Sequence, residues 1–574
     1  MGHRLMNEGL KWLFFSLWLI ANIAIFIATF LKFYTRKEYY YTREILREAL
    51  PIAKGSAAGL NLNSMLILIP VCRNLISFLR GSVFCQCCKR NVRRQLDKNI
   101  AFHKLCAYMI CFWTIIHYFA HTFNFERYWL AHESTDNSTG GLYSTLSNLP
   151  SQPNGTWINP IRPTTSATNP MLELVKNIAG YTGVIITIPL ILIMSSATEI
   201  IRRSYFEVFW YTHHLFIVYY IGLVTHGLGN VVRLQINIDD HDPEYCKDYY
   251  EEWGTPARPE CPIPQFSGDG ASSWKWVLAP ILLYIVERIM RFVRGMQMVT
   301  ISKVIKHPSQ VIELQMRKPG FTMEAGQYIQ IQCPSISRFE WHPFTLTSSP
   351  KEDFFSIHIR LVGDWTNALA EACHVNEDGL QDPGKMPRLA VDGPYGTCSE
   401  DAYRYQTVMF VGAGIGVTPF AAILKDIWYK HCDHNHQMKL TKVYFYWISS
   451  DTHSFEWFAD LLGSLEDQME NAGKSDLLTY NIFLTRGWNT RQALNIVTNV
   501  DKERDVITNL KHKTQFGRPK WEIEFDKIAR MHQGTRIGVF FCGPKSLSKE
   551  LHNTCNRFSD ASTATHFVYN KENF

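Results

Sequence analysis

The 574-residue sequence has several absences that narrow its possible functions. It has no stripe of basic residues interleaved with aromatics, and its formal net charge is only +6, so nucleic-acid binding is not expected. Its fourteen cysteines do not fall into the paired spacing of a zinc site. No acidic loop of the EF-hand form precedes the first apolar segment, which argues against calcium regulation of that kind.

What the chain has in abundance is long apolar segments, all in its first half. Six of them are long enough to cross a bilayer: 10–31, 52–78, 100–125, 172–198, 205–227 and 274–292. The first resembles a signal peptide, but it has no small-residue cleavage site and more apolar segments follow, so we expect it to be retained. Six crossings place both termini on the same side of the membrane.

The charges between the apolar segments predict which side is cytosolic. Residues 80–98, after the second segment, include six basic residues and one acidic residue. Basic residues also follow the fourth segment and end the sixth, and such residues favour the cytosolic side. The stretch 32–48 is basic on the opposite side, but its glutamates partly offset that charge. We therefore expect both termini to be cytosolic.

The loops on the opposite side carry features of an oxidising compartment. The loop after the third segment contains two glycosylation sequons, at Asn137 and Asn154. The loop after the fifth segment contains Cys246 and Cys261, which could form a disulfide there.

Histidines in the third and fifth apolar segments form the main candidate site. His103 and His117 are fourteen residues apart, and His213 and His226 are thirteen apart. At about 1.5 Å per residue, each pair spans roughly 20 Å of helix. An ionisable residue within a membrane segment is costly and is by default a functional hypothesis. If the two helices are neighbours, the imidazoles form two facing pairs, each suited to a six-coordinate haem iron.

The spacing of these histidines leaves alternatives open. Fourteen steps of about 100° return to within roughly 40° of the starting direction, whereas thirteen steps do not. Gly222 is a place where we expect the fifth segment to deform. His214 could replace His213 as a ligand, although we assign it a structural role. His121, four residues after His117, is assigned to the lining of the outer haem.

The residue pattern of the second half of the sequence is typical of a soluble α/β protein. Short β-rich runs separated by turn residues predict a small antiparallel barrel; they are 298–307, 311–318, 327–333 and 354–362. Strands alternating with helices then predict a parallel sheet of the nucleotide-binding type; the strands are 407–411, 442–449 and 537–541. We expect three domains: a membrane domain (1–292), a barrel (293–401) and an α/β domain (402–574).

Two groups of residues in this half suit cofactor binding. In the turn GAGIGVTP, glycines let the backbone approach a pyrophosphate and the next helix begins at its end; the candidates are Gly412, Gly414, Gly416, Thr418 and Pro419. In the barrel, an aromatic residue beside hydroxyls, with a basic residue downstream, suits a flavin. Those candidates are His342, Pro343, Phe344, Thr345, Leu346, Thr347, Ser348, His358, Ile359, Arg360 and Thr366.

Taken together, these motifs resemble the NADPH oxidase catalytic subunits, of the phagocyte-type flavocytochrome b heavy chain or a close paralogue. The resemblance rests on the segment histidines, HPFTLTSSP (342–350), DGPYG (392–396), GAGIGVTPF (412–420), Cys542-Gly543-Pro544 and the terminal KENF. It covers essentially the whole chain. It implies a six-helix transmembrane bis-haem bundle joined to a ferredoxin-reductase-like module, with an antiparallel β-barrel FAD domain and an α/β nucleotide-binding domain.

The resemblance also implies roles for single residues. His103 and His213 would hold the inner haem b, and His117 and His226 the outer one. FAD would lie on the barrel residues named above, and NADPH on the glycine-rich turn. Further contacts to cofactors are implied for Cys542, Gly543 and Pro544 beside the nicotinamide, Phe574 over the flavin ring, Arg518 at the 2′-phosphate, Lys54 near the outer haem, and Arg73.

Three positions depart from the family pattern. Ser450 replaces an arginine that is a candidate ligand of the 2′-phosphate, which weakens the expected preference for NADPH over NADH. Lys54 replaces an arginine, and the two side chains are not equivalent in bidentate contacts. Arg486 interrupts the usual LTGW sequence as LTRGW.

The implied function is the transfer of electrons from cytosolic NADPH, through FAD and two haems, to extracellular or lumenal oxygen, which becomes superoxide. Cytosolic activator proteins and a small membrane partner protein are implied, as is a plasma, phagosomal or endosomal membrane. One alternative is a ferric or cupric metalloreductase, which the lack of an evident metal site in the outer loops disfavours. Another is a proton channel lined by the segment histidines.

Overall fold

The computed structural model of the chain describes residues 2–81, 89–133, 137–149, 156–161, 169–307, 310–375, 383–433, 438–450, 456–486, 503–505, 507–560 and 564–572. These residues divide into two compact units. The unit that we call the helical unit comprises Phe14–Cys72 and Asn99–Ile285. The other, which we call the sheet unit, comprises Met1–Leu13, Arg73–Lys98 and Val286–Phe574.

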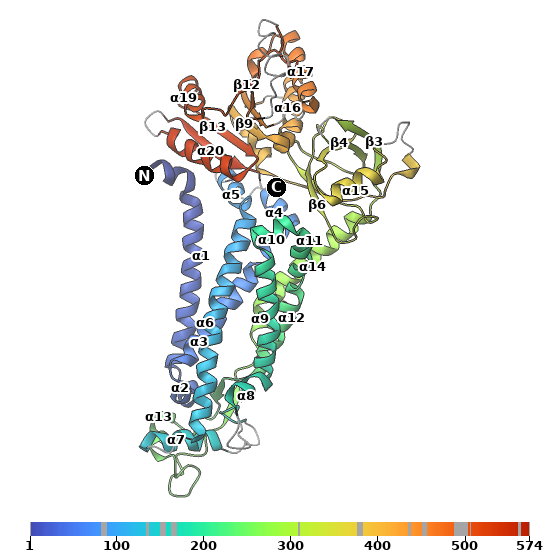
Figure 1. The fold of residues 1–574 in the computed structure, drawn as a ribbon. Helices are drawn as coiled ribbons and strands as arrows, with labels where there is room; N and C mark the ends of the chain where they lie inside the picture. The colour runs from blue at the N-terminus through green and yellow to red at the C-terminus, as the bar shows by residue number, and fades with distance from the viewer. Residues whose placement is uncertain are drawn as a thin grey trace. The chain divides into compact units, whose positions relative to one another are not determined.

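Long apolar helices dominate the helical unit (Figure 1). Their bounds are α1 (Gly2–Thr35), α3 (Ala49–Leu66), α6 (Asn99–Glu133), α9 (Ile178–Ser196), α11 (Phe206–His213), α12 (Phe216–His226) and α14 (Ser273–Met296). Among the described residues, five helical stretches are long and apolar enough to cross a membrane: Asn7–Thr35, Ala49–Val71, Asn99–His132, Ile178–Ser196 and Phe206–Gly229. The predicted sixth crossing is a continuous helix, α14, but it is not one of these five. Its crossing therefore stays a prediction.

Two of the predicted crossings differ in extent from what the apolar pattern suggested. The second ends with the short helix η2 (Ile69–Val71), because Cys72 leaves the helical conformation at ψ 86° and a separate helix, α4 (Arg73–Gly81), follows. The fourth begins only at α9, because the Asn177 side chain accepts a hydrogen bond from the Ala179 amide and starts a new helix after α8 (Pro170–Lys176). Local backbone breaks and polar caps therefore determine where these helices begin and end. Average hydropathy does not show such features.

A small irregular subdomain lies at one end of the long helices of this unit (Figure 1). It contains α2 (Tyr40–Leu46), α7 (Asn137–Asn148), α13 (Pro243–Cys246) and the antiparallel pair β1 (Arg233–Gln235) and β2 (Phe266–Gly268). Cys246 and Cys261 form a disulfide, as predicted, and both are buried among aromatic side chains. Of the two sequons, Asn137 begins α7 and Asn154 lies outside the described residues, so glycosylation stays a prediction.

The predicted barrel is present in the sheet unit as two three-stranded antiparallel sheets, ordered β3-β4-β7 and β6-β5-β8. The strands are β3 (Thr300–His307), β4 (Val311–Arg317), β5 (Tyr328–Gln332), β6 (His342–Thr345), β7 (Phe355–Arg360) and β8 (Ala390–Tyr395). Strand alternation builds the core, since Leu314, Ile329 and Ile357 are fully buried in it. Alternate residues on β4 and β7 therefore face away from that core.

A parallel sheet of six strands, in the order β12-β11-β10-β9-β13-β14, forms the rest of the sheet unit. Val408 and Phe410 pack against α16 and α17, whereas Met409 and Val411 pack against α19 and α20, so helices cover both faces (Figure 1). This confirms the α/β prediction. The elements are β9 (Thr407–Ala413), β10 (Lys442–Ser449), β11 (Leu478–Leu484), β12 (Gln515–Phe516), β13 (Arg536–Cys542), β14 (His566–Lys571), α16 (Thr418–Cys432), α17 (Glu456–Asn471), α19 (Trp521–Met531) and α20 (Lys545–Phe558).

Ion pairs hold two helices from residues 73–98, α4 and α5 (Lys89–Leu96), within the sheet unit. The Arg80 side chain is only 3% exposed and pairs with Asp97, Glu400 and Asp401. Arg93 reaches the same Asp401 carboxylate at 3.0 Å. Removing one partner of a buried ion pair leaves the other charges without compensation, which costs about 3–5 kcal/mol.

Replacing Arg80 with alanine should therefore lower the midpoint of thermal unfolding by several degrees. The matched control is Arg317→Ala, since the Arg317 side chain is 59% exposed, pairs with exposed Asp353, and should contribute about 0–1 kcal/mol. The midpoint can be followed by circular dichroism of the purified full chain. Equal shifts in the two variants would show that the Arg80 cluster does not stabilise this unit.

Candidate functional site

The four segment histidines form two facing pairs in the helical unit. His103 of α6 faces His213 of α11, and His117 of α6 faces His226 of α12; both pairs of ring centres lie 6.1 Å apart. A metal–imidazole bond of about 2 Å on either side of one ion places the ring centres about 6 Å apart. Both pairs therefore fit a bis-imidazole iron of the six-coordinate haem type.

Hydrogen bonds orient the rings of the α6 histidines. The Nδ1 atom of His103 donates to the Ile67 carbonyl at 2.9 Å, and that of His117 donates to the Ala53 carbonyl at 3.0 Å. Ligand histidines commonly donate their second ring N–H in this way, which fixes the tautomer and leaves Nε2 as the metal donor. Both carbonyls belong to the second crossing, so this segment positions the ligands of the third.

The partner histidines differ in how they are held. Nδ1 of His226 lies 3.0 Å from the Thr182 hydroxyl, which itself donates to the Ile178 carbonyl and so accepts the imidazole N–H. Nδ1 of His213 is buried and has no hydrogen-bond partner among the described residues. The His226 ring is therefore held by a protein contact that the His213 ring lacks in the described part of the chain.

A break in the fifth crossing brings His213 and His226 onto the same side. α11 ends at His213 and α12 begins at Phe216. The amides of His214 and Leu215 bond to carbonyls three residues back, so the turn is tighter than an α-helix. This tightened turn changes the helical phase, and thirteen residues can then return to one face.

Two sequence-based expectations for this segment have different outcomes. The Nδ1 atom of His214 donates to the Trp210 carbonyl at 2.7 Å, which agrees with a structural role. The expectation that the helix deforms at Gly222 is wrong, because α12 is continuous through it. A Cβ at Gly222 would lie 2.8 Å from the Ile186 side chain, so this glycine instead lets α12 pack closely on α9.

Two further predicted residues lie in this unit, His121 on the third crossing and Lys54 on the second. The ring centre of His121 is 4.6 Å from that of His117, as expected for a residue that lines the outer site. The Lys54 ammonium pairs with Asp269 at 3.8 Å and lies 5.1 Å from the Phe33 ring. Lys54 therefore already has a carboxylate partner in the helical unit, and its contact with a haem propionate stays a prediction.

The predicted flavin residues divide into surface and core positions of the barrel. His342 stacks on Trp365, with ring centres 4.1 Å apart, and Phe344 lies beside the same ring. Leu346 and Ile359 are buried in the core, so only their backbone could reach a cofactor. The remaining members of the set are Pro343, Thr345, Thr347, Ser348, His358 and Arg360 on β6, β7 and the chain between them, and Thr366 in the helix after β7.

The hydroxyl groups of the flavin set are engaged in local contacts. The Thr347 hydroxyl lies 2.8 Å from Nδ1 of His358. The Ser348 hydroxyl accepts a hydrogen bond from the Ser356 amide at 2.9 Å. The Thr366 hydroxyl accepts hydrogen bonds from the amides that precede α15 (Asp364–Ala372), so it caps this helix. These contacts preorganise the surface around His342, and direct bonds to a flavin stay predictions.

Beside this surface, Glu313 and His358 have shifted pKa values that sequence reasoning did not anticipate. Burial lowers the pKa of His358 to about 3, so its imidazole is neutral at neutral pH. Burial alone would raise the pKa of Glu313, but hydrogen bonds from His307 and Gln315 help lower it to about 2, so it is a carboxylate. His307 and Glu313 were missed because neither belongs to a motif with a known spacing.

The glycine-rich turn and the CGP sequence meet at one edge of the parallel sheet. β9 and β13 are neighbours, with Cys542 aligned to Gly412. Gly414 has a φ of +58°, and a Cβ on Gly416 would lie 2.4 Å from the Cys542 carbonyl, so both positions need glycine. After β9 the chain continues into β10, which is the neighbour of β9 on one side, whereas β13 is its neighbour on the other side. The strand order therefore reverses at β9, and open α/β sheets bind ligands at such switch points.

The helices that follow this turn begin at the same edge. Thr418 and Pro419 start α16, and Pro544 precedes α20, so two helix N-termini lie next to the backbone of Gly412 and Gly543. Amide groups at helix N-termini favour anions such as phosphates. Burial raises the pKa of the Cys542 thiol, so this side chain stays uncharged beside the turn.

Three more residues singled out in the sequence lie at this same carboxyl edge, farther along the parallel sheet. Arg518 is exposed after the edge strand β12, and Arg486 and Ser450 are exposed after β11 and β10. Nη1 of Arg73 is buried without a hydrogen-bond partner among the described residues, and its guanidinium lies 6.0 Å from the Tyr395 ring centre. A buried, unsatisfied cation of this kind suits an anionic group. Phe574 lies outside the described residues.

Comparison with known proteins agrees with this architecture. Three family models match: a ferric reductase like transmembrane component (residues 55–224), an FAD-binding domain (296–399) and a ferric reductase NAD binding domain (405–556). The chain is 52% identical to NADPH oxidase 3 of Homo sapiens, covering 100% of both chains, and 51% identical to NADPH oxidase 1 of Mus musculus, covering 100% of this chain and 95% of that one. It is 39% identical to a superoxide-generating NADPH oxidase heavy chain of Dictyostelium discoideum, covering 99% of this chain and 98% of that one.

The contact between Thr182 and His226 generates a prediction. Thr182→Val keeps the side-chain shape but removes the acceptor of the His226 N–H, and loss of such a contact typically costs 10–100-fold in ligand affinity. We expect the variant to lose haem from one of two sites, measured as haem-to-protein stoichiometry from the Soret absorbance. Thr187→Val is the control, since among the described residues that hydroxyl bonds only to the Gly183 carbonyl in α9. Equal haem content in all three proteins would contradict the assignment.

Proposed function

Because the chain belongs to the NADPH oxidase family, we propose that it carries electrons from cytosolic NADPH, through FAD and two haems, to oxygen across a membrane, and so produces superoxide. One observation carries this proposal. Two histidine pairs, each with ring centres 6.1 Å apart, join stretches of chain that are long and apolar enough to span a bilayer. Two such pairs on one pair of helices provide two haem sites at different depths.

Each cofactor has residues in the described chain that could hold it. His103 and His213 would ligate one haem, and His117 and His226 the other. The barrel surface around His342 would bind FAD, and the turn around Gly414 would bind NADPH. A flavin held there would supply the conversion between a two-electron hydride donor and one-electron acceptors.

The protein side chains set the conditions for this transfer. Two imidazoles at each site would hold one haem iron, and they would leave it no free position for oxygen. The carbonyls of Ile67 and Ala53 hold the ligand rings in one tautomer. Close approach of Gly416 to Cys542 positions backbone atoms and an uncharged thiol at the edge where the nicotinamide would lie. These residues would orient the carriers.

The proposal also includes the membrane in which the protein lies and the proteins that bind it. Apolar side chains exposed on α1 and α9 support a membrane-embedded bundle with room for a small partner protein. The basic helix α5 supports the docking of acidic surfaces of cytosolic activators. We propose a plasma, phagosomal or endosomal membrane with both termini cytosolic, and the domain limits 1–292, 293–401 and 402–574.

The names of the matched family models favour a second candidate, a metalloreductase that passes the same electrons to ferric or cupric ions. The two functions are separated by the acceptor. Purified protein freed of non-haem iron should consume oxygen with NADPH and yield a product that superoxide dismutase removes. Reduction of ferric chelate without such a product would favour the metalloreductase, and a protein without a Soret band would exclude both.

A substitution in the outer pair tests the route itself. His117→Leu should remove one of two haems and reduce superoxide production to background, while FAD content stays unchanged. His132→Leu is the control on the same helix, because His132 bonds to the Ile161 carbonyl and not to another segment histidine. Superoxide production by His117→Leu at the unmodified rate would refute the route through two haems.

A further inference from the structure

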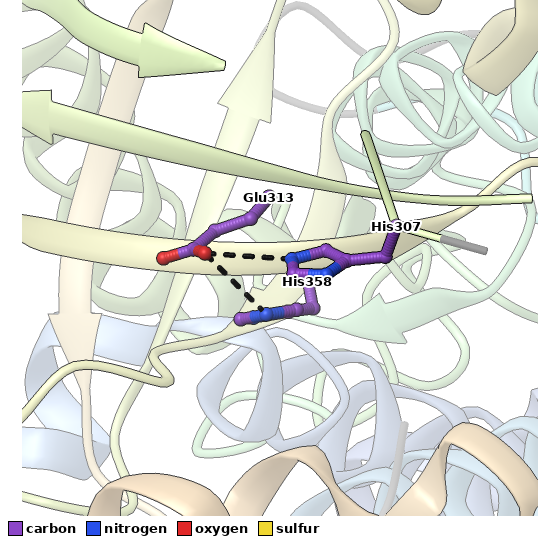
Figure 2. Close-up of side chains that lie close together, drawn as sticks. All are labelled: His307, Glu313 and His358. Carbon is purple, nitrogen blue, oxygen red and sulfur yellow. Dashed lines mark ion pairs between the residues drawn. The ribbon is translucent and has the colours of Figure 1, made fainter. Parts of the chain in front are cut away.

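Three strands of the barrel bring two histidines and one carboxylate together on the face away from the core. Glu313 of β4 lies directly opposite His358 of β7, and it pairs with Ile305 on its other side. His307 is two residues further along β3 and so is the diagonal neighbour of Glu313. Diagonal and opposite positions on one face are within reach of long side chains. Figure 2 shows the Glu313 carboxylate directed at both imidazoles.

The distances within this group are close to those of a metal site. Oε2 of Glu313 lies 3.5 Å from Nε2 of His307 and 3.8 Å from Nε2 of His358, and the three ligand atoms all lie within 4.8 Å of one another. Zinc bonds of about 2.0–2.1 Å in tetrahedral geometry place ligand atoms roughly 3.3 Å apart. Small side-chain shifts would therefore bring all three atoms into coordination range of one ion.

The atoms that would not bind the ion are held by neighbours. Gln315 donates to Oε1 of Glu313 at 3.1 Å, which leaves Oε2 directed at the imidazoles. The Thr347 hydroxyl lies 2.8 Å from Nδ1 of His358, which leaves Nε2 as the donor atom. Contacts of this kind orient the ligands of known metal sites.

We propose that His307, Glu313 and His358 bind a zinc ion. Two imidazoles and one carboxylate are a donor set that zinc accepts, with water as the fourth ligand. The side chains are 20%, 13% and 9% exposed, so an ion can enter from solvent and is then largely shielded. The ion would link β3, β4 and β7 and fix His358, two residues from Arg360. This inference does not depend on the electron-transfer function.

Zinc binding can be tested on the full-length chain with haem and flavin bound, purified without a polyhistidine tag and treated with a chelator. Titration with zinc chloride in a calorimeter should give one site per chain. Glu313→Gln, which keeps the size and one hydrogen bond of the side chain, should weaken binding at least tenfold, as should His307→Ala. His431→Ala on α16 is the control and should bind zinc like the unmodified chain.

Each outcome bears on the proposal. Soret and flavin absorbance verify that the variants are folded, and if His307→Ala fails to fold, Glu313→Gln carries the test. The absence of zinc binding by the unmodified chain would mean that the three side chains only contact one another. Unchanged affinity in Glu313→Gln would place the zinc elsewhere. Preference for iron(II) over zinc in a parallel titration would overturn the choice of metal.

Discussion

The structure of the helical unit depends on holding four histidines in two facing pairs within apolar helices. Polar groups in a bilayer must find partners within the protein, because no water is available there. The second crossing supplies carbonyls to His103 and His117, and α9 supplies the Thr182 hydroxyl to His226. The helices around the pairs are thus positioned by the hydrogen-bonding needs of the ligands as well as by apolar packing.

The irregular features of the helices serve the same pairing. A regular helix would turn His226 away from the side of His213, and the tight turn at His214 and Leu215 corrects that phase. Gly222 then lets α12 approach α9, which carries Thr182. A distortion and a close contact together place His226 between His117 and the Thr182 hydroxyl.

In the sheet unit, the candidate binding surfaces lie at the ends of strands and on strand faces that point away from the core. The parallel sheet brings the glycine-rich turn and Cys542 to one edge because β9 and β13 are neighbours. The antiparallel barrel places aliphatic residues in its core, so its polar residues share the opposite face. Two of the flavin candidates, His358 and Arg360, lie on β7, the strand that also contributes to the His307, Glu313 and His358 group. A structural ion there would stiffen the strand that carries Arg360.

Sequence periodicity and motif chemistry by themselves determined the apolar helices, the barrel strands, the parallel sheet and the four histidines, because these follow from side-chain patterns local to each element. Only the tertiary structure decided that the fifth crossing breaks at His214 and that Gly222 serves packing. It brought Thr182 beside His226 and Glu313 beside His358. It also placed residues 73–98 with the sheet unit, through the buried charge of Arg80. Such contacts join residues distant in the chain, and no local pattern encodes which elements become neighbours.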